Sequence, residues 1–389
     1  MSSYISSNAN RFYVAVEPAY GRAASIAAAN RFPAVRLHAH QNLQIGRRLD
    51  KTGTRTFTGA SSSSRRQTAF EAQTYLTSWT GSGQPGYGPL FQAALGAPVQ
   101  VATGLTIASL QGPLQMQTST PHGLAPGSAV CYENEIRFVA SLIDVQSFVI
   151  NAPFSSLLQP GSLLAPALTY APATAPPSLS IYDYWDPITA VSRLVVGACV
   201  DVMTISLNGD FHEFAFSGPA ADLLDSSSFV SGAGGLSSYP SEPALSAFDY
   251  SIVPGHLGEV WLGGPANQFF TLTAAMVEIR NNIEMRNLEF GSSYPRALAA
   301  GHREVVSKLS LLAQDDAQTL ALYAAAKQRM PMPVMLQLGQ QQGQLMAVYL
   351  PKMVPEIPIY DDSESRLQWE FQNNVAQGVA DDEIFVAFA

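Results

Sequence analysis

The chain contains the same series of short segments twice, and this internal repeat constrains its fold more than any other feature of the sequence. Residues 29–32 read Ala-Asn-Arg-Phe, and residues 266–269, found 237 positions later, read Ala-Asn-Gln-Phe. In each copy an alternating strand, a polar loop and a further strand follow; the further strand falls at 68–76 and at 304–312, an offset of 236. The repeat predicts two copies of one structural unit in a single chain.

A short helix follows in both copies. Residues 88–95 and 320–327, which are 232 positions apart, are rich in Ala and Leu. Apolar side chains spaced i, i+1 and i+4 share one helical face. In these segments they are Leu90, Phe91 and Ala94 in the first copy and Leu322, Tyr323 and Ala326 in the second.

The first copy carries an insertion after its helix. Phe214 and Phe216 correspond to Trp369 and Phe371 at an offset of 155, so the offset has fallen by 77 from 232. The insertion lies at about 97–175, and its alternating segments and Pro-rich ends predict a small β-barrel. Because the second copy has no counterpart, we expect this module to project outward from a complete barrel and to be dispensable for assembly.

The fold class that follows is mainly β. The 29 Gly and 26 Pro are spread along the chain, which favours many short strands joined by turns. We expect two barrel or sandwich domains, each with one short flanking helix, and one small inserted β domain. The first barrel takes residues 1–96 with 176–250, the insertion takes 97–175, and the second barrel takes 251–389.

Charge is scarce and unevenly distributed. Only 13% of the residues are charged, which indicates a surface covered by other subunits. Residues 1–66 carry ten Lys or Arg against two acids, whereas 194–279 carry nine acids and no Lys or Arg. This asymmetry fits either solvated faces or a head-to-tail assembly in which a basic end meets an acidic region. The basic residues are not interleaved with stacking aromatics, as those of a nucleic-acid reader would be.

The motifs that usually carry chemistry are missing or incomplete. Residues 81–86 match GxGxxG, but the next carboxylate is Glu133, too far away for a dinucleotide ribose. The six His residues show no metal-ligand spacing, and the paired acids sit where turns or helix starts are expected. Cys131 and Cys199 are too few for a disulfide framework. The sequence therefore predicts no enzyme, no metal and no cofactor.

The order of elements resembles that of the major tail tube proteins of long-tailed bacteriophages. The first copy shows a strand that ends in Leu-Thr-Ser-Trp at 76–79, a Gly-rich turn and a Pro-Leu-Phe-Gln-Ala-Ala-Leu-Gly helix at 89–96. The second copy shows related segments at 281–282, 301–303, 307–311, 346–351, 356–358, 369–371 and 383–386. The insertion, with Pro-His-Gly-Leu at 121–124, is similar to small β modules of other tail proteins. The resemblance implies barrels that assemble into rings, which stack as a hollow tube through which DNA leaves the capsid.

The resemblance also implies two kinds of functional residue. Long loops at 44–66 and 288–303 would reach the neighbouring ring. The candidate stacking residues are Arg47, Arg48, Arg55, Arg65, Arg66, Tyr294, Arg296 and Arg303. Carboxylates in the acidic stretch would face the lumen and repel DNA phosphates. The candidate lumen acids are Asp201, Asp210, Glu213, Asp222 and Asp225.

The expected partners are further copies of the chain, together with other tail proteins. The family implies six wall units in a ring, so three duplicated chains would close one ring with pseudo-sixfold symmetry. If the two halves instead form one wall unit, the ring is a hexamer. A distal tail or baseplate ring protein and an adhesin-type binding protein are the alternative functions. No signal peptide or membrane-spanning run is recognised, so we expect a protein made in the host bacterial cytoplasm and located in the virion tail.

Overall fold

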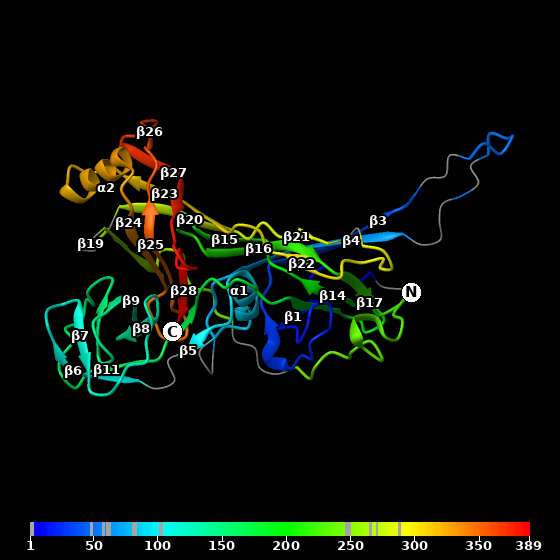
Figure 1. The fold of residues 1–389 in the computed structure, drawn as a ribbon, viewed down its shortest axis with the longest axis horizontal. Helices are drawn as coiled ribbons and strands as arrows, with labels where there is room; N and C mark the ends of the chain where they lie inside the picture. Colours follow the sequence, from blue (N-terminus) through cyan, green and yellow to red (C-terminus); the bar gives the residue numbers. More distant parts are fainter. Residues whose placement is uncertain are drawn as a thin grey trace.

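The computed structural model describes residues 4–46, 50–56, 59, 64–79, 84–100, 104–245, 250–263, 267–269, 271–286 and 289–389. As the sequence predicts, the fold is mainly β, with 44% strand and 7% helix. One extended sheet connects the two halves of the chain, and the outer sheet of the first copy and the sheet of the insertion both lie below it in Figure 1.

The extended sheet runs through both copies of the repeat. Along its path the order is β19-β18-β24-β25-β27-β23-β20-β15-β16-β4-β3. The first copy supplies β3 (Arg36–Gln44), β4 (Arg65–Tyr75), β15 (Val202–Leu207) and β16 (His212–Ala220). The second copy supplies β18 (Gly258–Leu262), β19 (Asn267–Gln268), β20 (Leu272–Arg280), β23 (Glu304–Leu312), β24 (Met332–Leu338), β25 (Met346–Val354) and β27 (Gln368–Ala376). Off this path, β26 (Ile359–Asp361) pairs with β27, and β28 (Phe385–Phe388) pairs with β25.

The first copy is completed by a separate outer sheet with the order β17-β14-β13-β1-β2. Its strands are β1 (Asn10–Val16), β2 (Arg31–Phe32), β13 (Leu179–Trp185), β14 (Arg193–Ala198) and β17 (Asp222–Asp225). Helix α1 (Gly88–Ala94) is almost wholly buried, because Leu90 and Phe91 lie in the core shared by this sheet and the extended one. Helix α2 (Ala317–Gln328) buries only the face that carries Thr319, Leu322 and Ala326.

Strand pairing repeats between the two copies almost residue for residue. In the first copy Phe214 pairs with Thr74, and in the second Trp369 pairs with Leu311. The second strand of the repeat is therefore displaced by 237 positions, and the offset of 236 expected from the sequence is wrong by one residue. With an offset of 237, each buried position of β4 corresponds to a buried position of β23. A shift by one residue would instead align buried positions with exposed ones, because side chains alternate between the two faces of a strand.

The two halves are joined edge to edge, so they are not two separate barrels. Strand β15 of the first copy pairs with β20 of the second over six residues, from Val202 opposite Arg280 to Leu207 opposite Ala275. The second copy closes further on itself, because β25 pairs with β27 at Met353 and Val354. The expected pair of barrels is thus a fused structure with one continuous sheet.

The insertion forms a sheet of its own, with the order β11-β6-β7-β10-β9-β8. Its strands are β6 (Leu105–Leu110), β7 (Gln115–Thr118), β8 (Ala129–Tyr132), β9 (Glu135–Leu142), β10 (Ser147–Ile150) and β11 (Leu163–Leu164). The flanking strands β5 (Val99–Gln100) and β12 (Leu168–Tyr170) pair with each other, and β12 also pairs with β28. The separate module is therefore shorter than 97–175 and spans about 104–165.

The module is packed against the second copy of the repeat, and its outward projection from an assembly stays a prediction. One buried cluster combines Phe138 and Ile136 of the module with Met335, Tyr349 and Phe385 of the second copy. The rings of Phe138 and Tyr349 are stacked with centroids 5.2 Å apart. An insertion in the first copy thus covers the outer face of the second (Figure 1).

A short β-pair extends the second copy toward the first. Strands β21 (Glu284–Met285) and β22 (Leu298–Ala299) lie in the loop that connects β20 to β23. This loop reaches the start of β4, where the N–H of Arg66 donates to the carbonyl of Ser293 at 2.7 Å.

Candidate assembly surfaces

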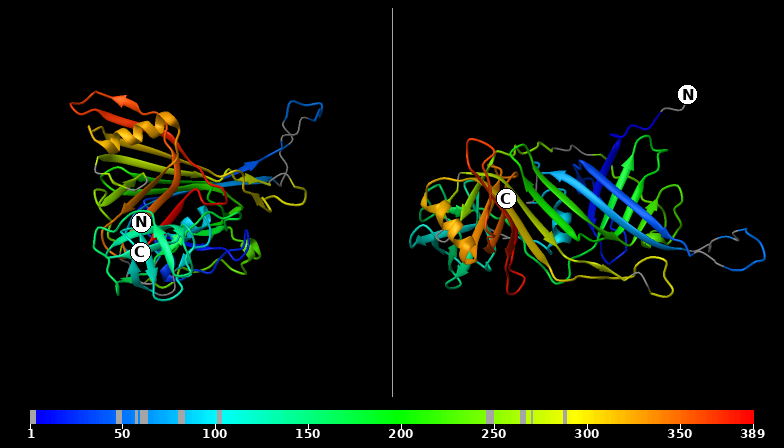
Figure 2. Two further views of the ribbon diagram at one scale, coloured as in Figure 1. Left: turned by 60° about the vertical axis from the view of Figure 1, so that its left-hand side comes forward. Right: turned by 90° about the horizontal axis from the view of Figure 1, so that it is seen from above.

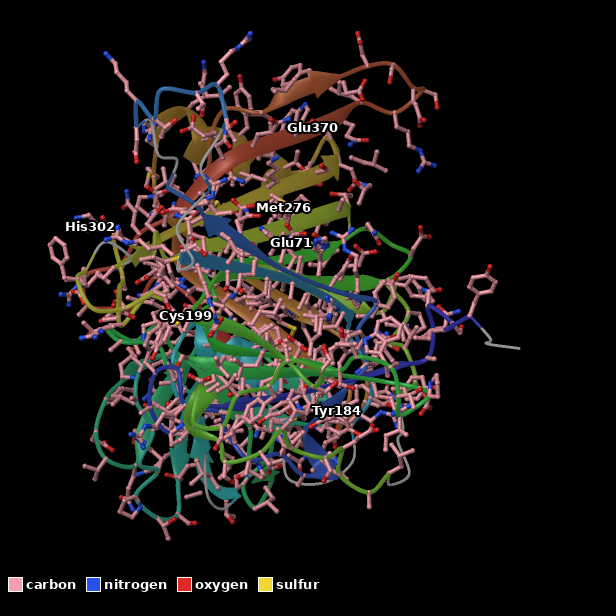
Figure 3. The ribbon with its side chains drawn as sticks, turned by 90° about the vertical axis from the view of Figure 1, so that its right-hand side faces the viewer. Glu71, Tyr184, Cys199, Met276, His302 and Glu370 are labelled. Carbon is pink, nitrogen blue, oxygen red and sulfur yellow. The ribbon has the colours of Figure 1, made fainter. Side chains whose placement is uncertain are left out.

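The extended sheet has one face that no other sheet of the described chain covers. Opposed residues of an antiparallel pair point to the same face, so the registers place Glu71, Glu213, Met276 and Glu370 on it together. Figure 3 shows Glu71, Met276 and Glu370 following one another across the sheet. The charged side chains that the registers place on this face include Glu71, Glu213, Glu278, Glu304, Asp361 and Glu370 against Arg36, Arg65, Arg280 and Lys308. This free face is acidic on balance.

The structure brings only one of the five candidate lumen acids onto the free face, namely Glu213. Asp201 accepts a hydrogen bond from the N–H of Ile283 at 2.7 Å, at the end of the sheet. Asp210 lies in the turn between β15 and β16. Asp222 and Asp225 lie on β17, which belongs to the outer sheet.

Asp222 and Asp225 are engaged within the chain. Asp222 is buried and pairs with Arg66 at 2.8 Å. Asp225 accepts from the hydroxyls of Ser227 and Ser228, and these bonds lower its pKa to about 2. Neither carboxylate belongs to the free face, and their place in a lumen stays a prediction.

The free face also carries Glu71, Glu304 and Glu370, which lie outside the acidic stretch, and Glu278, which lies within it but is not among the five candidates. Each occupies the polar phase of an alternating strand, opposite to the buried positions of that strand. Period-2 alternation would have identified them, whereas the density of acids along the chain did not.

The two long loops leave the same end of the molecule (Figure 2). Arg47 and Arg48 fall outside the described residues. Arg55 is exposed, Arg65 is half-buried at the start of β4, Tyr294 is 49% exposed, and Arg296 donates to the carbonyl of Gly291 at 2.8 Å. The second loop therefore presents Tyr294 at the end where the first loop projects.

Arg66 and Arg303 form ion pairs within the chain, and a role for them in stacking stays a prediction. They occupy corresponding positions, 237 residues apart, at or just before the start of β4 and of β23. Arg66 pairs with Asp222, whereas Arg303 pairs with Glu383 at 2.8 Å and Asp381 at 3.0 Å. In the first copy the acid follows β16 at the start of β17, and in the second the acids lie between β27 and β28. The ion pair is therefore a structural contact that occurs in both copies.

Two open strand edges lie on different copies of the repeat: β3 ends the path of the extended sheet in the first copy, and β26 is an edge strand beside β27 in the second. Strand β3 pairs only with β4, and β26 pairs only with β27, among the described residues. Ile359 and Tyr360 of β26 are more than half exposed. Open edges that carry exposed apolar side chains are sites where another chain can add.

A buried carboxylate holds the outer sheet of the first copy together. Glu17 accepts hydrogen bonds from the hydroxyls of Ser178 and Ser180 at 2.6 and 2.9 Å. It also accepts from the N–H groups of Gly21 and Gly197, both at 2.8 Å. Burial raises the pKa of Glu17 above its ordinary value of 4.5, although the four donors oppose that shift.

Replacing Glu17 with Gln is expected to lower the free energy of unfolding by about 1–3 kcal/mol, because the amide nitrogen cannot accept from the donors that face it. A carboxyl group with a raised pKa contributes stability that is lost as pH rises through the folded-state pKa. The gap between wild type and Glu17→Gln should therefore narrow as pH increases above about 4.5. Denaturant unfolding across pH measures this, with exposed Glu71→Gln as the control; a gap that widens with pH would contradict it.

No group of three or more His, Cys, Asp and Glu side chains is arranged to hold a metal ion in the described part of the chain. None of the described helices is long and apolar enough to cross a membrane. No protein-family model matches the chain, and no curated protein sequence matches it significantly. The surfaces of the molecule are therefore the observations that bear on its function.

Proposed function

We propose that the chain is a structural subunit that closes into a homotrimeric ring and that the rings stack into the tail tube of a long-tailed bacteriophage, the conduit for DNA. The observation that carries this proposal is the junction between β15 and β20. One chain contains one complete junction between two equivalent units and leaves the corresponding strands, β26 and β3, open. A heterologous contact of this kind gives a ring when its rotation closes.

Two further features support a tube. The free face of the extended sheet is acidic on balance, and a negative wall repels the phosphates of passing DNA. Both long loops leave one end of the molecule, where they can contact the next ring (Figure 2). No catalytic role is proposed.

Purified protein is expected to form threefold rings of about three times the 41.6 kDa of one chain, which stack into uniform tubes. A ring of three fused chains brings fewer molecules together than a hexamer of single units, so less translational and rotational entropy is lost on assembly. Mass photometry and averaged end-on electron micrographs provide the measurement. Six identical lobes would contradict the trimer, unstacked closed rings would favour a distal tail or baseplate protein, and discrete monomers would overturn the proposal.

A further inference from the structure

We infer that β26 of one chain pairs with β3 of the next chain, in the register of the internal β15–β20 junction. The acidic turn after β26 then docks in the hollow beside β3. This inference rests on the proposed ring and adds the residues that meet between chains. The partner is a second copy of this chain.

The register follows from the repeat. Strand β26 is the counterpart of β15, because Ile205 pairs with Phe214 just as Tyr360, 155 positions later, pairs with Trp369. Both hairpins lie next to equivalent strands, since β16 pairs with β4 and β27 pairs with β23. The outer edge of β26 therefore corresponds to the edge of β15 that pairs with β20.

Strand β3 is the counterpart of β20 by the same reasoning. Leu37 lies opposite Ala72, and Ala275 lies opposite Leu309. Since Ala72 corresponds to Leu309, Leu37 corresponds to Ala275, an offset of 238. The outer edge of β3 thus corresponds to the edge of β20 that accepts β15.

Transferring the internal register to the open edges gives the pairs between chains. Thr204 opposite Glu278 becomes Ile359 opposite His40. Ser206 opposite Met276 becomes Asp361 opposite His38. The uncharged Ser206–Met276 pair of the internal junction is thus replaced by a carboxylate facing an imidazole.

A hollow beside β3 supports the same docking. It has a volume of about 500 Å³ and is lined in part by Phe12, Phe32 and Leu37. The equivalent hollow at the internal junction is lined by Val260 and Phe269 of the second copy, and there Leu207, Gly209 and His212 from the β15–β16 hairpin provide part of the other wall. The neighbouring chain's β26–β27 turn would provide that wall at β3.

The charges of the two surfaces are complementary. The turn carries Asp361, Asp362 and Glu364 with one base, Arg366. The hollow is bordered by Arg31 and Arg36. Complementary charges of this kind fix the register and suppress wrong pairings. From the sequence we considered an assembly in which the basic N-terminal region meets the acidic stretch 194–279. In the contact inferred from the structure, the acidic partner of the basic region is instead the turn at 361–364.

Cysteine cross-linking tests the register. In the double variant His40→Cys with Ile359→Cys, the two positions face each other only between chains, so oxidation is expected to convert most of the protein into covalently closed trimer. Native Cys131 and Cys199 are buried and do not compete. In the control Arg36→Cys with Ile359→Cys, the cysteines are four residues out of register, about 13 Å along the strand, beyond disulfide reach.

The outcomes separate the register from the ring. Closed trimer from the 40/359 pair and none from the 36/359 pair supports the inference. Wild-type rings without a 40/359 cross-link, or with a 36/359 cross-link, overturn the register and leave the ring proposal intact. Absence of wild-type rings overturns the proposed function itself. The 40/359 variant could itself fail to form rings under reducing conditions. In that case the double variant Asn42→Cys with Ile357→Cys replaces it, because the inferred β26–β3 register also places these two positions opposite each other, and the same outcomes apply.

Discussion

Replacing residues 104–165 with a short Gly/Ser linker is expected to give an insoluble or unfolded protein. The module covers Trp261, Met335, Tyr349 and Phe385 of the second copy, and all four are at most 6% exposed in its presence. Burial of one large apolar side chain contributes roughly 1.5–3 kcal/mol, so uncovering four would cost about 6–12 kcal/mol. That cost approaches the whole stability of a typical domain, about 5–15 kcal/mol. Soluble expression and thermal unfolding of the shortened chain measure the effect.

Two point variants separate this contact from the deletion itself. Phe138→Ala removes the ring that stacks on Tyr349 and should cost about 3–5 kcal/mol. Val145→Ala, at a turn of the module where the side chain is 70% exposed, should change stability by less than about 0.5 kcal/mol. A shortened protein that stays soluble and forms rings would restore the sequence expectation of a dispensable module.

The repeat could be predicted from the sequence because local patterns determine it. Both copies of the Ala-Asn-x-Phe motif place a buried Phe, Phe32 or Phe269, beside the first strand of the copy. Strand alternation likewise predicts which side chains of β4 and β23 are buried. The offset of 236 failed because a shift of one residue is invisible to composition, although it exchanges the two faces of a strand.

The packing of the module could not be predicted in this way. In the contact, Phe138 of the module packs on Tyr349 of β25. The sequence of β25 has the same alternating apolar pattern whether a module, another subunit or a loop of the same chain covers its apolar side chains. The first copy illustrates the alternative, because Phe229 and Tyr239 from a loop cover Tyr182 and Leu194 of the outer sheet. Alternation shows that a face is buried, and it does not show what buries it.

The surface on which the candidate lumen acids lie could not be predicted for a related reason. The number of acids in a stretch of sequence does not place them on one surface, because β17 belongs to a different sheet from β16 although the two strands are nearly continuous. Asp222 consequently pairs with Arg66, at a half-buried site away from the free face. Assigning charges to a surface requires the strand order, which the sequence pattern did not provide.

Arg137 presents the second large effect, because it is a fully buried cation at the contact between module and second copy. Its guanidinium pairs with Glu135 at 2.5 Å and donates to the carbonyl of Pro153 at 2.8 Å. It also lies over the ring of Trp261, 4.8 Å from the centroid. Burial lowers the pKa of Arg137, and Glu135 and then Glu259 oppose that shift; an arginine nevertheless stays protonated in proteins.

Replacing Arg137 with Met is expected to lower the free energy of unfolding by about 3–5 kcal/mol, because a buried ion pair that loses one partner leaves the other charge uncompensated. The matched control is Arg329→Met, whose guanidinium lies on the surface, 68% exposed, beside Glu356; such pairs contribute about 0–1 kcal/mol. Adding Glu135→Gln to Arg137→Met should recover part of the loss, since the double variant no longer buries an unpaired carboxylate. Denaturant unfolding followed by tryptophan fluorescence measures the free energy of unfolding of the wild type and of these three variants. Equal stability of Arg137→Met and Arg329→Met would show that the buried cation does not hold the module to the second copy, and the packing of Phe138 on Tyr349 would then have to account for that contact alone.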